Sequence, residues 1–428
     1  MDVSGPVLPG WSLTCPACGS IFAPGNYPRG CPACRERGVT QALVVAYDNP
    51  GALPPLERTG EGIWKYAAFL PALAEEHRRT LGEGDTPLLH MPLLSEITGC
   101  EHLYLKMETQ NPTAAHKDRF HAVAVAVGKA LGYDRVVSAS TGNHGLSMTA
   151  YANAHGMKAV VIANQRMPTL LQRAIRLMGG LPLLAPPHLS DALEQELIEG
   201  EGWYPSTGSW PMPLGNHFGI EGYKTIGIEI YQQLGSRMPD LVFLPVAGGD
   251  GVVGMWRAIQ ALRRLGLPQT EARLVACQPA GAAPLVSALE QGLDHVPFLA
   301  DAYSIALSIG DPITGALALP AIRETGGFGI RVTDEAILET GRLLMRAGLL
   351  VEPSSAASVA GALQILRERP ELREQTLVCV VTSSGLKWLD DYADDGPLPA
   401  GVRVETVDEA RRAVEAYVEG SSPAPPPR

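Results

Sequence analysis

The sequence predicts an α/β protein in which parallel or mixed twisted sheets are covered on both faces by helices. From Leu88 onward, apolar strand-like runs alternate with helical stretches, which is the pattern of strand–helix–strand units. The 428 residues are 46% hydrophobic and 18% charged, so the chain has apolar surface for the cores of more than one domain. Binding sites in such folds lie at the carboxyl ends of the strands.

The predicted elements follow from apolar runs and their periodicity. Apolar runs of strand length occur at residues 103–107, 135–138, 158–162, 241–246, 273–277 and 377–381. Helical stretches occur at residues 120–131, 146–155, 170–178, 222–234 and 252–265. A Pro- and Gly-rich connector at residues 48–55 separates an N-terminal segment, and the Pro-rich tail at residues 421–428 is expected to be disordered.

Four cysteines near the N-terminus have the spacing of a metal-binding knuckle. They form two C-x2-C pairs that are separated by twelve residues: Cys15, Cys18, Cys31 and Cys34. Two such pairs predict tetrahedral thiolate binding of one zinc ion, and four thiolates make that zinc structural. A redox pair or a knuckle that has lost its ion is the alternative. The remaining cysteines lie in apolar runs and are expected to be buried: Cys100, Cys277 and Cys379.

Net charge and hydropathy exclude several classes of function. The formal net charge of −11 argues against general binding to nucleic acid or to anionic membranes. No apolar run is long enough to span a bilayer, and the first residues lack the basic start and apolar core of a signal peptide. We therefore expect a cytoplasmic protein without a nucleic-acid or membrane partner.

Lys117 lies at a turn between a strand and a helix. The strand-like run at residues 103–107 precedes it, and the helical stretch at residues 120–131 follows. A helix start carries partial positive charge and disfavours an ammonium group. Such a lysine is easier to deprotonate, and a neutral amine can form a Schiff base with a carbonyl cofactor.

Three further turns follow predicted strands, and we expect each to open a helix. Residues 138–145 are small and polar, so their backbone N–H groups suit a substrate carboxylate, and Asn143 adds an amide for a phenolic oxygen. Residues 247–251, Ala-Gly-Gly-Asp-Gly, form a phosphate nest. Thr382, in the third turn, offers a hydroxyl to a ring nitrogen. Each turn alone is also compatible with simple capping or turn chemistry.

The glycines Gly249, Gly251 and Gly254 also match a dinucleotide fingerprint. That motif requires an acidic residue at the end of the next strand, where this chain has Gln278. The four turns together offer a reactive amine, a phosphate nest, a phenol partner, a ring-nitrogen partner and a carboxylate site. Those groups are what pyridoxal 5′-phosphate (PLP) holding an amino acid requires.

The motifs resemble the threonine synthase branch of the fold-type II PLP enzymes, in the tryptophan synthase β-subunit superfamily. The resemblance runs from about residue 81 to residue 387, and some family members carry a four-cysteine knuckle. Seven segments carry it: Leu81-Gly-Glu-Gly-Asp-Thr-Pro-Leu88, Asn111-Pro-Thr-Ala-Ala-His-Lys-Asp-Arg119, Ser140-Thr-Gly-Asn143, Glu221-Gly-Tyr-Lys-Thr225, Ile309-Gly-Asp-Pro312, Val351-Glu-Pro-Ser-Ser355 and Gly385-Leu-Lys387. The family's lysine motif reads Asn-Pro-Thr-Gly-Ser-Phe-Lys-Asp-Arg.

The resemblance implies a division into domains and a role for each site residue. The expected domains are a knuckle at 1–48, a large PLP-binding domain at 49–130 and 235–395, a small substrate domain at 131–234, and a C-terminal helix with tail at 396–428. Lys117 would be the catalytic Schiff-base residue. The other implied cofactor contacts are His116, Asn143, Ala247, Gly248, Gly249, Asp250, Gly251 and Thr382. The implied substrate contacts are Thr113, Ser140, Thr141, Gly142 and His144.

Departures from the family pattern concern the substrate. Threonine synthases have an arginine at the position of Gly219 that helps to bind the substrate phosphate, and glycine does not replace such a contact. The family's threonine after the turn asparagine is His144 here, and Asp250 puts a carboxylate into the phosphate nest, so we expect it to point away or to cap the turn.

Three functions stay open on the sequence. The first is PLP-dependent elimination and replacement of the threonine synthase type, from O-phosphohomoserine to threonine and phosphate. The second is β-elimination or β-replacement on a serine- or cysteine-type substrate, as in cysteate-synthase-like or dehydratase-like relatives. The third is a non-catalytic paralogue that binds a ligand. The resemblance further implies a homodimer that acts on a small amino-acid substrate.

Overall fold

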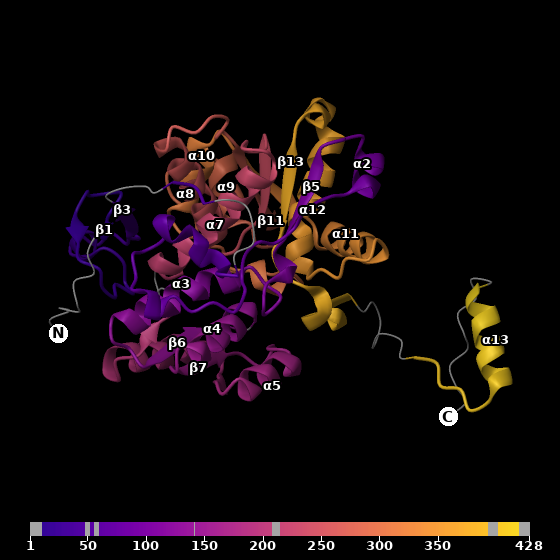
Figure 1. Ribbon diagram of the computed structural model, residues 1–428, viewed down its shortest axis with the longest axis horizontal. Helices are drawn as coiled ribbons and strands as arrows, with labels where there is room; N and C mark the ends of the chain where they lie inside the picture. The colour runs from indigo at the N-terminus through magenta and orange to yellow at the C-terminus, as the bar shows by residue number, and fades with distance from the viewer. Residues whose placement is uncertain are drawn as a thin grey trace. The chain divides into compact units, whose positions relative to one another are not determined.

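The computed structural model describes residues 11–47, 52–54, 60–140, 142–207, 215–392 and 401–418 (Figure 1). The predicted tail at residues 421–428, most of the connector at residues 48–55 and the candidate residue Thr141 lie outside these ranges. The chain divides into two compact units, residues 1–388 and residues 389–428. The second unit contains a short 3-10 turn at Leu389–Tyr392 and helix α13, Val407–Val418. Among the described residues, no helix is both long and apolar enough to cross a membrane.

The larger of two central sheets has six strands. In spatial order they are β12 (Phe328–Val332), β11 (Arg273–Pro279), β10 (Leu241–Pro245), β13 (Leu377–Val381), β5 (Leu103–Met107) and β4 (Leu88–His90). All neighbours are parallel except the antiparallel pair of β4 and β5. Because β10 and β13 lie between β11 and β5, the carboxyl ends of β5, β10 and β13 meet at one edge, where the lysine turn, the nest and the Thr382 turn begin.

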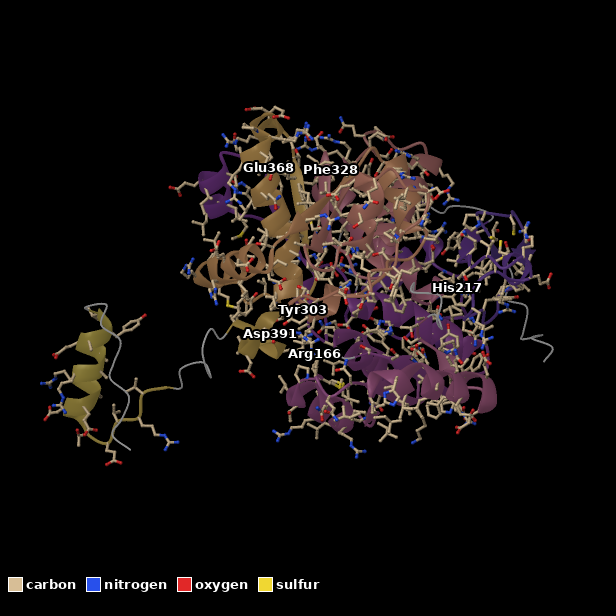
Figure 2. The ribbon with its side chains drawn as sticks, turned by 180° about the vertical axis from the view of Figure 1, so that it is seen from behind. Arg166, His217, Tyr303, Phe328, Glu368 and Asp391 are labelled. Carbon is tan, nitrogen blue, oxygen red and sulfur yellow. The ribbon has the colours of Figure 1, made fainter. Side chains whose placement is uncertain are left out.

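The smaller central sheet has four parallel strands. In spatial order they are β8 (Leu181–Leu184), β7 (Lys158–Ala163), β6 (Arg135–Ala139) and β9 (Tyr204–Pro205). The turn that was predicted to suit a substrate carboxylate, residues 138–145 and named the carboxylate turn below, begins at the end of β6 and runs into α4. The sheets are joined through their loops as well as through the chain: Figure 2 shows Arg166 near Tyr303, and the guanidinium carbon of Arg166 lies 6.0 Å from the centre of that ring.

Helices cover the sheets, so the predicted α/β class is confirmed. They are α1 (Pro32–Arg35), α2 (Pro92–Thr98), α3 (Lys117–Ala130), α4 (Asn143–Ala154), α5 (Thr169–Leu177), α6 (Pro187–Gln195), α7 (His217–Gln233), α8 (Asp250–Arg264), α9 (Pro284–Glu290), α10 (Ala318–Glu324), α11 (Asp334–Arg346) and α12 (Pro353–Glu368). Helices α3, α4, α7 and α8 begin two to five residues before the predicted starts at 120, 146, 222 and 252. Their first turns carry polar or small site residues, so the apolar periodicity starts only after them.

The turn at Thr382 was expected to open a helix, and this expectation is wrong. Two short 3-10 turns, Gly385–Lys387 and Leu389–Tyr392, follow it in place of an α-helix. Ser383 and Ser384 instead form isolated antiparallel bridges with Ala115 and Val351. Those bridges hold the turn against the lysine loop, so its hydroxyl groups are placed by pairing with two other segments.

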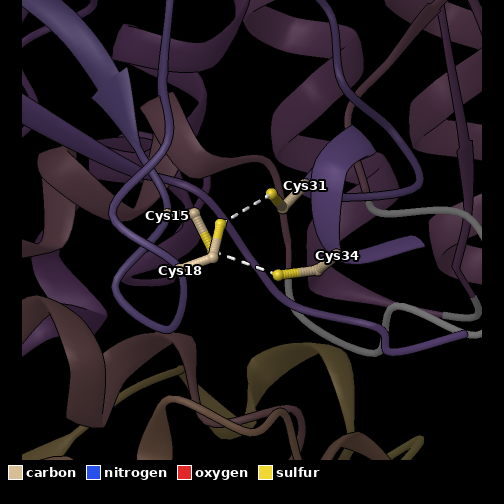
Figure 3. A group of neighbouring side chains, drawn as sticks. All are labelled: Cys15, Cys18, Cys31 and Cys34. Carbon is tan, nitrogen blue, oxygen red and sulfur yellow. Dashed lines mark hydrogen bonds between the residues drawn. The ribbon is translucent and has the colours of Figure 1, made fainter. Parts of the chain in front are cut away.

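The N-terminal segment forms a small antiparallel sheet, β2 (Ile21–Phe22), β1 (Trp11–Thr14) and β3 (Val44–Tyr47). All four of its cysteine thiols converge, as Figure 3 shows, with ligand atoms within 4.8 Å of one another. The Sγ atoms of Cys15 and Cys34 are 3.6 Å apart, and those of Cys18 and Cys31 are 3.7 Å apart. The other three cysteines are buried, as predicted.

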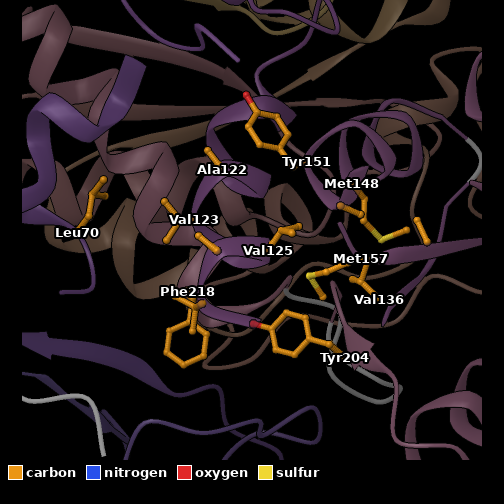
Figure 4. Packing of buried hydrophobic residues seen from close by; sticks show 14 of the residues in the cluster. Leu70, Ala122, Val123, Val125, Val136, Met148, Tyr151, Met157, Tyr204 and Phe218 are labelled. Atoms are coloured by element: carbon orange, nitrogen blue, oxygen red, sulfur yellow. The ribbon is translucent and has the colours of Figure 1, made fainter. Parts of the chain in front are cut away.

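One hydrophobic cluster joins the knuckle sheet, helix α3 and the smaller central sheet. It contains Trp11 and Leu13 of β1 together with Val123, Phe218 and Tyr204, and Figure 4 shows part of this packing. The ring of Trp11 meets that of Phe218 edge to face at 5.2 Å. The knuckle is therefore packed against the start of α7 and is not a separate appendage.

Candidate active site

Lys117 is the first residue of α3 and is only partly exposed. Its Nζ atom lies 5.7 Å from the centre of the Tyr223 ring. Burial lowers the pKa of this amine, while the carboxylates of Asp250, Asp311 and Glu352 act in the opposite direction. The amine is therefore easier to deprotonate than an ordinary lysine, as predicted, and its burial is the main cause.

The loop before Lys117 is fixed by hydrogen bonds on both sides. The backbone N–H and the hydroxyl of Thr113 both donate to Asp118, each at 2.6 Å. The ammonium of Lys387 donates to the carbonyl of Thr113 at 2.8 Å. Ala114 has a φ of 57°, which is the left-handed region, at the position where the family's lysine motif has glycine. The loop is thus held in a conformation that alanine rarely adopts.

A buried ionic cluster lies behind the loop. Arg119 donates to both carboxylate oxygens of Glu108 and of Glu229 at 2.7–2.8 Å, and Lys106 donates to Glu229 at 2.7 Å. All four side chains are fully buried. Because Arg119 is on α3, Glu108 follows β5 and Glu229 is on α7, this cluster fixes the lysine helix to the larger sheet.

The predicted phosphate nest is a tight turn at the start of α8. Gly249 has a φ of 95°, and a Cβ atom there would lie 2.7 Å from that of Ala318, so only glycine fits. The Thr314 hydroxyl donates to the Ala247 carbonyl at 2.8 Å, and the backbone N–H of Gly315 donates to the Gly248 carbonyl at 2.9 Å. The first N–H groups of a helix have no acceptor within the helix, so this turn can hold an anion.

Asp250 lies within the nest, and its carboxylate accepts a hydrogen bond from the Gly215 N–H at 2.8 Å. Burial raises its pKa, which the nearby Lys117 partly offsets. The carboxylate therefore contacts the loop before α7. Gly251, the last residue of the predicted nest, is the second residue of α8. The hydrogen bond from Gly215 holds the Asp250 carboxylate at the loop before α7, and the carboxylate also lies close enough to Lys117 to affect its pKa.

The turn after β6 is capped by Ser140, whose hydroxyl accepts from the N–H groups of Gly142 and Gly145 at 3.3 and 3.2 Å. Asn143 begins α4 and donates to Glu352 at 2.6 Å. The side-chain oxygen of Asn143 is buried and has no hydrogen-bond partner among the described residues. This unsatisfied amide is consistent with a polar ligand group beside the turn.

His116, the residue before the lysine, contacts Thr382 through its backbone N–H, which donates to the Thr382 carbonyl at 2.8 Å. The ring of His116 stacks on Tyr223, with centres 4.9 Å apart and planes 20° apart, and its Nδ1 atom is 3.2 Å from the Thr382 carbonyl. Burial holds the pKa of His116 well below its usual range. The Thr382 hydroxyl is 2.9 Å from that of Ser355.

His144 belongs to a buried polar group of three residues. Its Nε2 atom is 2.9 Å from the Ser206 hydroxyl and 3.2 Å from Nε2 of His121. The ring of Phe120 packs against His144 at 5.2 Å. That ring also occupies the space beside Gly219, where an added Cβ atom would lie 2.5 Å from it.

Six residues near the lysine had no role in the sequence prediction. They are Tyr223, His121, Ser206, Asp311, Glu352 and Lys387. Tyr223, Asp311, Glu352 and Lys387 lie within segments that carried the family resemblance, so a signal existed for them. His121 lies inside a helix and Ser206 beside a short strand, and neither has a local motif that marks it.

Comparison with known proteins gives the class first. The family model described as "Pyridoxal-phosphate dependent enzyme" matches residues 79–383. The fold also resembles two solved structures. Serine racemase from Dictyostelium discoideum is 24% identical, with a TM-score of 0.59 and coverage of 71% of this chain and 93% of that one. A fungal L-serine ammonia-lyase from Rhizomucor miehei is 21% identical, with a TM-score of 0.63 and coverage of 72% of this chain and 97% of that one.

Curated relatives narrow the class. The threonine synthase of Methanocaldococcus jannaschii is 33% identical over 76% of this chain and 80% of its own length. That of Methanosarcina acetivorans is 31% identical over 94% and 98%, and that of Mycobacterium bovis is 35% identical over 77% and 89%. The chain belongs to the PLP-dependent enzymes of fold type II and, within them, to the threonine synthase family.

Proposed function

We propose that this chain is a PLP-dependent lyase of the threonine synthase type, acting on an amino acid that carries a leaving group on its side chain. Lys117 carries the proposal, because it is a partly buried amine with a lowered pKa at the start of a helix. The nest, the carboxylate turn and the Thr382 turn all lie on the segments that follow β10, β6 and β13. The proposed roles of individual residues follow from this arrangement.

The residues around Lys117 fit the cofactor. The nest at residues 247–251 would hold its phosphate through backbone N–H groups, Asn143 would contact its phenolic oxygen, and Thr382 would face its ring nitrogen. The Asn143 amide nitrogen donates one of its two hydrogens to Glu352, so the other is a donor for the phenolic oxygen, and the first N–H groups of α8 have no acceptor within the helix. His116 remains a proposed neighbour of the cofactor. When bound, PLP supplies an aldehyde for amines and a ring that withdraws electrons from Cα.

In the proposed reaction, Lys117 removes the Cα proton and shuttles protons along the substrate. The turn at residues 140–142 would hold the substrate carboxylate, and Thr113 and His144 would face its side chain. With O-phosphohomoserine, phosphate would leave from Cγ and water would add at Cβ, which gives threonine. This proposal is supported by the threonine synthases among the relatives.

A second candidate, β-elimination or β-replacement on a serine- or cysteine-type substrate, is supported by Gly219. The Phe120 ring fills the space where a side chain at this position would begin. No arginine can therefore stand at position 219 without displacing Phe120. A substrate without a second phosphate would not need that arginine.

The test of the cofactor role is Lys117→Ala, with Lys129→Ala as its matched control at the other end of α3. We expect reconstituted wild-type protein and Lys129→Ala to show the visible absorbance of lysine-bound PLP, and Lys117→Ala to lose it. A visible band that survives in Lys117→Ala would contradict the proposal.

The test of the reaction is turnover by the cofactor-loaded protein. We expect phosphate and threonine from O-phosphohomoserine in equal amounts. Pyruvate or a β-substituted alanine from O-phosphoserine or O-acetylserine, with no threonine formed, would favour the second candidate. No turnover on either substrate set would favour the non-catalytic paralogue.

We propose that the four N-terminal cysteines bind one structural zinc ion. A tetrahedral site with Zn–S bonds of about 2.3 Å has sulfur atoms about 3.8 Å apart. The separations of 3.6 and 3.7 Å fit that geometry before any adjustment. We expect metal analysis to find one zinc per chain and Cys15→Ser with Cys34→Ser to lose it. A wild-type protein with far less than one zinc per chain would refute the site.

We also propose a cytoplasmic homodimer, as the family resemblance implies. Light scattering of the purified protein tests the oligomeric state, and a monomer at micromolar concentration would contradict it.

A further inference from the structure

The hydrogen bonds of His121 fix where its proton lies. Its Nδ1 atom is 3.0 Å from the Lys117 carbonyl oxygen and 3.0 Å from the Ser147 hydroxyl oxygen. A carbonyl can only accept, and the Ser147 hydroxyl already donates to Asp118 at 2.6 Å. Nδ1 of His121 therefore carries the hydrogen, and its Nε2 atom is an acceptor.

The same reasoning continues through Ser206 to His144. The Ser206 hydroxyl lies 2.8 Å from Nε2 of His121 and donates to it. The Ser206 oxygen then accepts from His144, whose Nε2 atom is 2.9 Å away. His144 thus carries its proton on Nε2, and Nδ1 is left with a lone pair. The hydrogen bonds of His144 to other described residues all run through Nε2.

Both rings are neutral near pH 7. Burial, with a contribution from Lys117, holds the pKa values of His121 and His144 well below the usual range. The aromatic ring of Phe120 lies against both of them. His121, His144 and Phe120 therefore offer an acceptor nitrogen and an apolar ring, and none of these three side chains carries a positive charge that would attract a phosphate.

The position of this cluster places His144 beside a bound amino acid. Lys117, Phe120 and His121 share one face of α3 because they are three and four residues apart. His144 directly follows Asn143 in the carboxylate turn. His121 and Ser206 are fully buried, whereas His144 keeps 8% of its surface exposed. Lys117 contributes to the lowered pKa of His144, so the two side chains lie close to each other. An amino acid bound between the lysine and the turn would therefore have His144 beside its side chain.

We propose that Nδ1 of His144 accepts a hydrogen bond from a hydroxyl group on the β-carbon of the bound amino acid. This inference rests on the proposed function, since it places an amino acid between Lys117 and the turn. The hydroxyl has two possible sources: the substrate's own β-hydroxyl, or the water that adds during threonine formation. In either case His144 favours a β-hydroxy amino acid over an amino acid of the same shape that has no hydroxyl group on its β-carbon.

The experiment compares L-threonine with L-valine, which has a methyl group in place of the hydroxyl. Binding to the PLP-loaded protein is followed by the cofactor spectrum and, independently, by the ligand-induced shift in Tm. We expect threonine to bind about tenfold more tightly, which is the effect of one hydrogen bond of about 1.4 kcal/mol.

Four variants separate the role of His144 from a structural one. His144→Phe removes the acceptor, and we expect the threonine-to-valine ratio to fall to about one. His144→Asn keeps an acceptor and should retain part of the preference. Ser206→Ala removes the acceptor that keeps the His144 proton on Nε2, so it should lower the threonine-to-valine ratio while both ligands still bind. His155→Phe, at the other end of α4, is the control and should leave the ratio unchanged.

Equal binding of threonine and valine to the wild-type protein would overturn the inference, as would an unchanged ratio in His144→Phe. A phosphonate mimic of O-phosphohomoserine distinguishes the two sources. Tight binding of the mimic assigns the hydroxyl to added water, and weak binding assigns it to the substrate. The proposed function fails by a different result, the absence of turnover, which can occur while the threonine preference is intact.

Discussion

Helix α3 has a buried polar cluster on each side, and the two clusters differ in charge. In the charged cluster, Arg119 and Lys106 are paired with Glu108 and Glu229. In the neutral cluster, His121, Ser206 and His144 are joined by hydrogen bonds between uncharged groups. Both clusters are almost completely buried, so in each of them other interactions must offset the free energy of removing polar groups from water.

The clusters meet that cost in different ways. Burial alone would raise the pKa of Glu229, but Arg119 and Lys106 hold it below its ordinary value. The two histidines bond to hydroxyl groups, to a carbonyl and to each other, and they stay neutral. The paired charges of the Arg119 cluster hold α3, α7 and the larger sheet together. In the neutral cluster, each hydrogen bond has a defined donor and acceptor. We therefore assign fixation of the helix to the charged cluster and recognition of the ligand to the neutral one.

The largest expected effect comes from breaking the charged cluster. Arg119→Ala leaves Glu108 and Glu229 buried without their main cation, so we expect a loss of about 3–5 kcal/mol in the free energy of unfolding. Urea denaturation measures this loss. Arg135→Ala removes an arginine whose ion pair with Asp134 is exposed, and it should change the stability by less than about 0.5 kcal/mol. Similar losses in the two variants would contradict the ionic role.

Glu194 sharpens the comparison, because it is a buried glutamate whose hydrogen-bond partners are neutral. Burial raises its pKa to about 7, although Thr207 and the Ala139 N–H donate to one of its oxygens. The folded protein therefore keeps the proton in the pH window between the unfolded value of 4.5 and about 7, and stability falls as the pH rises through that window.

We expect Glu194→Gln to stabilise the fold. The amide oxygen can accept both hydrogen bonds and carries no charge. The gain should be absent below pH 4.5 and should reach about 1–3 kcal/mol above pH 7. Unfolding curves at pH 4.5, 6 and 8 measure it. A gain that does not depend on pH would show that the Glu194 carboxyl is not the titrating group.

Breaking the neutral cluster should have a smaller effect on stability. His121→Phe keeps a ring of similar size but leaves Ser206 without its acceptor, so we expect a loss of about 1–3 kcal/mol. The same variant frees the proton position of His144 and should reduce its preference for threonine. A loss as large as that of Arg119→Ala would mean that the two clusters do not differ as described.

The smallest expected effect is at Ala114, in the loop that both clusters support. Its φ of 57° is unfavourable for alanine, and glycine adopts it without strain. We expect Ala114→Gly to raise stability by at most about 1 kcal/mol, since the greater entropy of glycine in the unfolded chain offsets part of the gain. Thermal unfolding measures the change, and a clear loss of stability would show that the alanine methyl group packs favourably.

The sequence predicted six of the ten strands in the two central sheets, the five helices α3, α4, α5, α7 and α8, and the positions along the chain of the lysine turn, the nest and the turn after β6; it did not predict β4, β8, β9 and β12. Strand and turn patterns are local, and a lysine or a glycine run at a helix start is visible in one stretch of chain. The same reasoning failed for the helix expected after Thr382. Ser383 and Ser384 pair with Ala115 and Val351, which are far away in the sequence, and no local pattern encodes that pairing.

The sequence by itself determined the class of the protein, because the lysine motif, the glycine nest and the four cysteines each act through neighbours in the chain. The tertiary structure decided what surrounds the substrate. Phe120 fills the space beside Gly219, and His121 orients His144 through Ser206, only because α3, α4, β9 and α7 pack together. The positions of protons on buried histidines depend on partners from several elements, and such partners are known only once the chain is folded.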